Sequence, residues 1–99
     1  MIPFSPRARQ QLEELTRHYA DRGRDLAIDR LIDSVERASA RYLANRGQFF
    51  DAPRPYPALL RRGWRWTKEG RYWIAFSSAK DGAIIRAIFY ESAEIPGRL

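Results

Sequence analysis

The sequence contains no cysteine, a single histidine (His18) and only two lysines (Lys68 and Lys80) among its 99 residues. Without cysteine the chain forms no disulfide and no thiolate metal site, and one histidine cannot build a multi-histidine metal site. We therefore expect neither a metal ion nor another cofactor. A chain without cysteine is compatible with a reducing compartment, and we expect a cytoplasmic protein.

Long apolar segments are also missing. No run approaches the roughly 20 residues of a membrane helix, and the start, Met-Ile-Pro-Phe-Ser-Pro, has no signal-peptide pattern. We expect no membrane partner. A length of 99 residues with 44% hydrophobic residues can fill one modest core, so we predict a single domain over residues 1–99.

The common catalytic motifs are absent as well. The sequence has no Gly-x-Ser-x-Gly elbow, no Gly-x-Gly-x-x-Gly loop and no Walker pattern. Glu13 and Glu14 are adjacent, so on a helix they point in different directions and do not form a paired-carboxylate site. The remaining chemical signal is basic charge.

Basic residues outnumber acidic ones by 18 to 12, which gives a net charge of +6, and 16 of the 18 are arginine. The planar guanidinium suits phosphate and carboxylate groups. The excess as a whole favours an acidic partner, either nucleic acid or an acidic protein segment. For any single arginine, a solvated surface position is an equally good interpretation.

The N-terminal half predicts a short edge strand at residues 1–4 and then two helices. Ser5 suits an N-cap and Pro6 the first helical position. Apolar residues then recur at helical spacing as far as Tyr19, and again over residues 28–43. The break at residues 22–23, Arg-Gly, is short, so we expect an antiparallel helical hairpin.

The C-terminal half predicts a sheet. Three prolines at alternate positions make residues 48–58 an extended connector. Three strand-like runs follow, separated by turn signals at residues 69–70 and 80–82. Such a sheet needs one covered face, which the helical stripes can supply. We therefore predict a two-layer α+β fold, with the N-terminal antiparallel helical hairpin packed on a C-terminal antiparallel, twisted sheet of three to four strands.

Arginines and aromatic residues alternate along these strands. Guanidinium groups bind phosphates and aromatic rings stack on bases, so an RNA cleavage site without metal is conceivable. Strand alternation places Ile84, Arg86, Ile88 and Tyr90 on one face, with Arg86 and Tyr90 about 13 Å apart at ~3.3 Å per residue. From this spacing alone we favour a structural interpretation, with Tyr90 half-buried and Arg86 at the surface. The tryptophans are expected in the core.

Four stretches of the chain occur in a characteristic order. Residues 4–8 read Phe-Ser-Pro-Arg-Ala and are followed by Leu12; residues 60–63 read Leu-Arg-Arg-Gly. Residues 70–76 read Gly-Arg-Tyr-Trp-Ile-Ala-Phe, and residues 87–96 read Ala-Ile-Phe-Tyr-Glu-Ser-Ala-Glu-Ile-Pro. In this order and spacing they resemble the RelE/ParE toxin superfamily of bacterial toxin–antitoxin pairs, over most of the chain. The resemblance agrees with the predicted fold.

The resemblance implies one of two activities. RelE-like members cleave mRNA on the ribosome with strand arginines or lysines and a C-terminal Tyr or His, whereas ParE-like members lack these groups and poison DNA gyrase. RelE-like proteins carry Tyr-Arg at the start of the central strand, but this chain has Tyr72 and Trp73 there. We therefore favour a ParE-like toxin that inhibits gyrase by direct binding, with no catalytic residue of its own.

Two alternatives stay open. One is a metal-independent, ribosome-dependent endoribonuclease with Arg65, Arg86 and Tyr90 as catalytic residues; Tyr90 stands where ParE-like proteins often have His. Lys68 and Arg65 would then replace the arginine missing at Trp73. The other is a non-toxic binding module of the same fold, held with its antitoxin in a DNA-binding autorepressor complex.

The resemblance also implies partners. A cognate acidic antitoxin would fold over the helices and sheet as it binds, and the +6 charge would speed that encounter. The target would be DNA gyrase, or the ribosome and mRNA in the alternative, and DNA would be contacted only through the antitoxin. The candidate target-binding residues are Arg61, Arg65, Arg71, Arg86, Tyr90 and Glu94.

Overall fold

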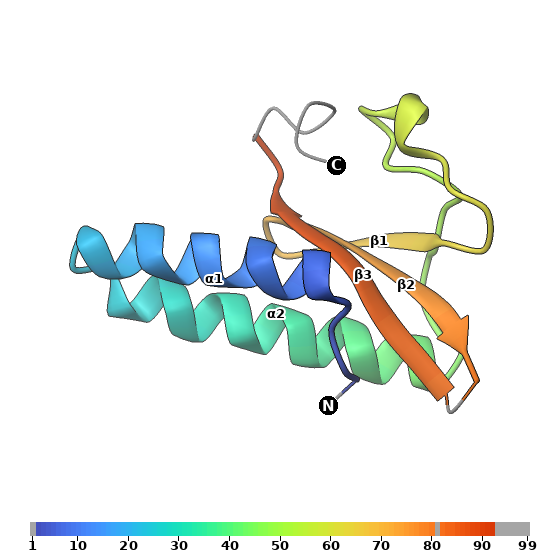
Figure 1. Ribbon diagram of the computed structural model, residues 1–99, viewed down its shortest axis with the longest axis horizontal. Coiled ribbons are helices and arrows are strands. Elements are labelled where there is room, and N and C mark those ends of the chain that lie inside the picture. The colour runs from blue at the N-terminus through green and yellow to red at the C-terminus, as the bar shows by residue number, and fades with distance from the viewer. Residues whose placement is uncertain (1, 81, 93–99) are drawn as a thin grey trace.

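The computed structural model of the chain describes residues 2–80 and 82–92. Two helices pack on a three-stranded antiparallel sheet in the order β1-β2-β3 (Figure 1), which confirms the predicted α+β architecture. The elements are α1 (Pro6–Asp21), α2 (Asp25–Leu43), a short 3-10 helix η1 (Pro57–Leu59), β1 (Arg65–Glu69), β2 (Tyr72–Ala79) and β3 (Gly82–Tyr90). Because η1 begins at Pro57, the connector predicted over residues 48–58 is not extended to its end. Within the described part, no helix is long and apolar enough to span a membrane.

The hairpin of α1 and α2 forms as the sequence predicts. The side chain of Ser5 accepts a hydrogen bond of 3.1 Å from the backbone N–H of Ala8, and Pro6 is the first residue of α1. Gly23 adopts a φ of +64°, which suits glycine, and reverses the chain between the helices. The backbone N–H of Arg24 then donates to the carbonyl of Tyr19 at 2.8 Å and closes the turn.

The helices cover one face of the sheet, here called the inner face. Phe76 of β2 is fully buried there and stacks on Tyr42 of α2, with ring centroids 4.7 Å apart. Fully burying one such side chain contributes about 1.5–3 kcal/mol. The other buried members of this inner core include Leu31, Val35, Ala38, Tyr72, Ile74, Ile85 and Ile88.

The opposite, outer face of the sheet is covered by the connector between α2 and β1 (Figure 1). Phe50 of the connector meets Trp73 edge to face at 6.3 Å, and Tyr56 meets Phe89 in the same way at 6.0 Å. The buried members of this outer cluster are Leu59, Trp66, Trp73, Ala75, Ala87 and Phe89. The expectation that the sheet tryptophans belong to the core is confirmed for Trp66 and Trp73, and the sheet aromatics do not form an open platform.

A β-bulge at Arg86 interrupts the alternation of β3. Ala75 pairs with Ala87 but its neighbour Phe76 pairs with Ile85, so Arg86 is the extra residue. Ile85 therefore joins Ile88 in the inner core, whereas the Nε of Arg86 donates to Ser77 Oγ at 2.7 Å. The prediction that Ile84, Arg86, Ile88 and Tyr90 share one face is wrong for this reason.

Short bridges lie along both outer strands of the sheet. Phe4 forms a parallel bridge with Ile85, which is what residues 2–4 form of the edge strand predicted at residues 1–4. On the other side, Phe50 and Trp66 exchange two backbone hydrogen bonds of 2.7 Å. Farther along β3, the side-chain carbonyl of Gln11 accepts the backbone N–H of Ile88 at 3.0 Å.

Candidate functional site

Three of the predicted target-binding arginines are held by local contacts. Arg65 forms an ion pair with Asp51 and donates to the carbonyl of Phe49 at 3.1 Å, which ties β1 to the connector. Arg61 donates to two carbonyls of its own loop. Arg86 is bound to Ser77 at the bulge. Each of these contacts accounts for the position of its arginine side chain without a bound ligand.

Arg71 and Tyr90 are the predicted residues that the structure brings together. The Nη1 of Arg71 donates to the Tyr90 hydroxyl at 3.2 Å and lies 3.5 Å from Oε1 of Glu91. Glu94, the last member of the predicted set, lies outside the described residues.

The three candidate catalytic residues of the ribonuclease alternative do not converge. Arg65 pairs across the sheet with Phe76, level with the bulge at Arg86, whereas Tyr90 pairs with Tyr72. Phe76 and Tyr72 are four residues apart on β2, which is about 13 Å at ~3.3 Å per residue. The two arginines therefore lie near one end of the sheet and Tyr90 near the other.

A groove of about 1200 Å³ runs between the two helices, the β1–β2 turn and the end of β3, and is here called the helix–sheet groove. Its lining contains one carboxylate, Glu14, and one histidine, His18. Guanidinium groups dominate the lining, so the groove attracts negatively charged ligands. The lining arginines are Arg7, Arg24, Arg30, Arg37 and Arg71.

Three tyrosines stand at one end of this groove. The hydroxyls of Tyr19 and Tyr72 are hydrogen-bonded at 2.5 Å, and the ring of Tyr72 meets that of Tyr90 edge to face at 5.7 Å. Burial, together with the hydrogen bond between Tyr72 and Tyr19, raises the pKa of Tyr72. The hydroxyl of Tyr72 therefore keeps its proton throughout the physiological range. The guanidinium of Arg24 lies over the Tyr19 ring, 5.6 Å from its centroid.

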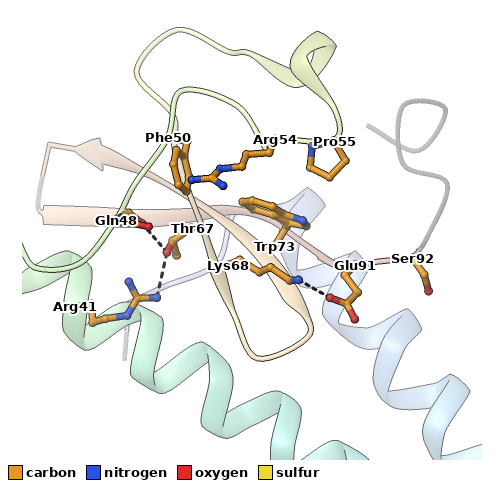
Figure 2. Close-up of a pocket in the computed structure, with 10 residues that line it drawn as sticks. All are labelled: Arg41, Gln48, Phe50, Arg54, Pro55, Thr67, Lys68, Trp73, Glu91 and Ser92. Atoms are coloured by element: carbon orange, nitrogen blue, oxygen red, sulfur yellow. Dashed lines mark hydrogen bonds and ion pairs between the residues drawn. The ribbon is translucent and has the colours of Figure 1, made fainter.

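A second cavity of about 730 Å³ lies where the connector crosses the outer face, and is here called the connector pocket (Figure 2). Trp73 and Phe50 supply aromatic walls, and Arg54 lies over the Phe50 ring at 4.9 Å. Lys68 points across the pocket to Glu91, with Nζ 2.5 Å from Oε2 (Figure 2). This hydrogen bond from Lys68 lowers the pKa of Glu91, which keeps the pair charged.

Sequence reasoning missed Tyr19, Tyr72 and Arg24 as members of a site. Tyr19 was predicted on the apolar stripe of the first helix, and its burial in the inner core confirms this. Which face of the central strand the helices would cover was not predicted, so the meeting of Tyr72 with Tyr19 could not be foreseen. The position of Arg24 above Tyr19 depends on the turn between the helices.

No ready metal site accompanies these cavities: within residues 2–80 and 82–92, no three His, Cys, Asp or Glu side chains gather closely enough to hold a metal ion. A comparison with models of protein families finds no match, and neither does a comparison with curated proteins.

Proposed function

We propose that this chain is a ParE-like member of the RelE/ParE superfamily, a toxin that inhibits DNA gyrase by direct binding and is neutralised by an acidic antitoxin. The observation that carries the proposal is the separation of Tyr90 from Arg65 and Arg86. Trp73 adds to it, because it fills the family's arginine position with a buried ring.

The separation matters because phosphodiester cleavage without a metal needs a cation and a proton-transfer group at the same phosphate. Arg65 is already paired with Asp51, and Arg86 donates to Ser77. An inhibitor that acts by binding needs only a complementary surface, which does not require these side chains to converge.

The helix–sheet groove supports the proposed antitoxin partner. Five arginines and a single carboxylate line it, so an acidic, partly disordered segment gains charge complementarity as it folds there. The expected consequence is association that slows steeply as ionic strength rises.

The proposal is tested with purified chain, purified gyrase and relaxed plasmid. We expect loss of supercoiling or a trapped cleavage complex, and growth arrest when the chain is expressed. Tyr90→Phe removes only the hydroxyl that the ribonuclease alternative would need for proton transfer, so this variant should still arrest growth if the chain acts on gyrase by binding. Growth arrest with supercoiling intact and no trapped complex would contradict the proposal.

A ribosome-dependent endoribonuclease is the second candidate, and two observations favour keeping it. Lys68 lies beside Trp73 in the connector pocket, and Arg71 is hydrogen-bonded to Tyr90. Primer extension on translated mRNA would then show cuts in codon register that vanish in Tyr90→Phe and persist in Arg61→Gln. Uncut message in arrested cells would eliminate this candidate, and harmless overexpression without a partner would instead indicate a non-toxic binding module.

A further inference from the structure

The end of the helix–sheet groove formed by Tyr19, Tyr72, Tyr90, Arg24 and Arg71 has a surplus of hydrogen-bond donors; we call it the tyrosine end. The hydroxyls of Tyr19 and Tyr72 are 2.5 Å apart, so one of their two protons lies between them. The second proton has no acceptor among the described residues. Burying a hydroxyl proton without an acceptor is unfavourable, so this proton is available to a ligand.

Tyr90 and the two arginines add further donors. The Tyr90 hydroxyl accepts from Arg71, which leaves its own proton to be donated. Both contacts of Arg71, to Tyr90 and to Glu91, use the Nη1 atom. The guanidinium of Arg24 contacts the Tyr19 ring and has no hydrogen-bond acceptor in the part of the chain described here.

Acceptors at this end are scarce by comparison. Glu91 already binds Lys68 at 2.5 Å and Arg71 at 3.5 Å. Glu14 is the carboxylate that lines the groove itself. A ligand that satisfies these donors must bring several acceptor oxygens and negative charge together. A terminal phosphate group has three free oxygens and up to two charges, whereas a carboxylate has two oxygens and one charge.

The remainder of the groove leaves room for an uncharged group attached to that phosphate. The partly buried side chains of Leu15 and Ala27 form an apolar part of its lining. The volume of about 1200 Å³ is ample for a ligand larger than phosphate alone, since sites for small molecules typically measure about 300–1,000 Å³.

We propose that the tyrosine end of the helix–sheet groove binds the phosphate of a nucleoside diphosphate, whose base lies along the apolar lining. Arg24 and Arg71 face the phosphate oxygens, and the tyrosine hydroxyls donate to them. This inference goes beyond the proposed toxin function, because it requires neither gyrase nor an antitoxin, and either idea can fail without the other.

The test is calorimetric titration of the full chain with adenosine diphosphate in about 0.15 M salt, where weak surface attraction is screened. Losing one hydrogen bond to a charged group costs at least a factor of about ten in affinity. We therefore expect Arg24→Gln and Arg71→Gln each to weaken binding about tenfold or more. Both side chains are exposed, so neither change should prevent folding.

Arg17→Gln is the matched control, because it removes the same charge from an exposed position of α1 outside the groove lining. We expect its affinity to stay within about twofold of the wild type, since a distant surface charge is screened. Tyr90→Phe should weaken binding without changing the thermal midpoint appreciably. Inorganic phosphate should compete with the nucleotide at the same residues, and adenosine without phosphate should not bind measurably.

Four results would overturn the inference. One is no heat of binding at millimolar adenosine diphosphate. A second is an equal loss of affinity in Arg17→Gln and Arg71→Gln, which would indicate attraction by overall charge. A third is tight binding of adenosine alone. The fourth is tighter binding of a hexaglutamate peptide than of the nucleotide, lost in Arg71→Gln, which would assign the tyrosine end to an acidic protein segment.

Discussion

Trp73 offers a quantitative check of the buried outer face. Its side chain is only 4% exposed and lies between the central strand and the connector, with Phe50 edge to face against it. Replacing a buried tryptophan by alanine typically costs about 3–5 kcal/mol, from lost transfer energy and the cavity left behind. A chain of 99 residues has roughly 5–15 kcal/mol of stability in total, so Trp73→Ala should remove at least about a fifth of it.

The assay is equilibrium unfolding in urea followed by far-ultraviolet circular dichroism, because removing a tryptophan alters the fluorescence signal. With a slope of about 1–3 kcal/mol per molar urea, the midpoint should fall by at least ~1 M while the slope is unchanged. Trp64→Ala is the matched control: Trp64 is only partly buried at the margin of the same cluster, so its loss should be clearly smaller. A loss below about 1 kcal/mol at Trp73, or an equal loss at both positions, would refute the idea that the connector closes this face.

Three further predictions concern the inner face. The pKa of Tyr72 is raised in the folded chain, so the tyrosine of the unfolded chain loses its proton first as pH rises. The contribution of Tyr72 to the free energy of unfolding is therefore complete below about pH 10 and is lost as pH rises further. Urea titrations at pH 9 and 11 should show a smaller fall in the free energy of unfolding for Tyr72→Phe than for the wild type. Gly70 has a φ of +59° and its added Cβ would lie 3.1 Å from Ser34 Oγ, so Gly70→Ala should cost about 1–3 kcal/mol and lower the thermal midpoint. Glu69 pairs with Arg37 and Arg41, so Glu69→Gln should cost about 1 kcal/mol at low salt and less in 1 M salt.

The helical half was predictable because its signals are local. Ser5 and Pro6 start α1 through a capping hydrogen bond and a preset φ, neither of which depends on the rest of the chain. Hydrophobic periodicity then placed Leu31, Val35 and Ala38 on the buried stripe of α2. Alternation along β2 separates Tyr72, Ile74 and Phe76, which face the helices, from Trp73 and Ala75, which face the connector, but both faces are buried.

The bulge and the outer cluster were not predictable in the same way. Nothing in the run Ile-Ile-Arg-Ala, residues 84–87, marks an extra residue, since it contains neither glycine nor proline. Its position follows from pairing with β2 and with Phe4, which are distant in sequence. The connector prolines predicted an extended path, but which sheet face that path would cover depended on tertiary packing.

The candidate site was predictable only in part for the same reason. Arg71 and Tyr90 were selected as strand residues of suitable chemistry, and the pairing of β2 with β3 brings them together. Arg65 was selected on the same grounds, yet its ion pair with Asp51 gives it a role in fixing the connector. Composition identifies arginines that suit an anion, but tertiary contacts decide which of them are already occupied.

The short bridges along the two outer strands bear on how copies of this chain behave at high concentration. An unpaired strand edge is a template for pairing with another molecule, and natural sheets usually protect it. Here the backbone of Phe50 is hydrogen-bonded to that of Trp66 on one side. On the other side, the backbone N–H of Ser5 donates to the carbonyl of Ile85, the N–H of Ile85 donates to the carbonyl of Pro3, and the N–H of Ile88 donates to the side chain of Gln11. These few contacts interrupt any continuous ladder that an incoming strand could extend. We therefore expect these contacts to oppose edge-to-edge aggregation of the chain.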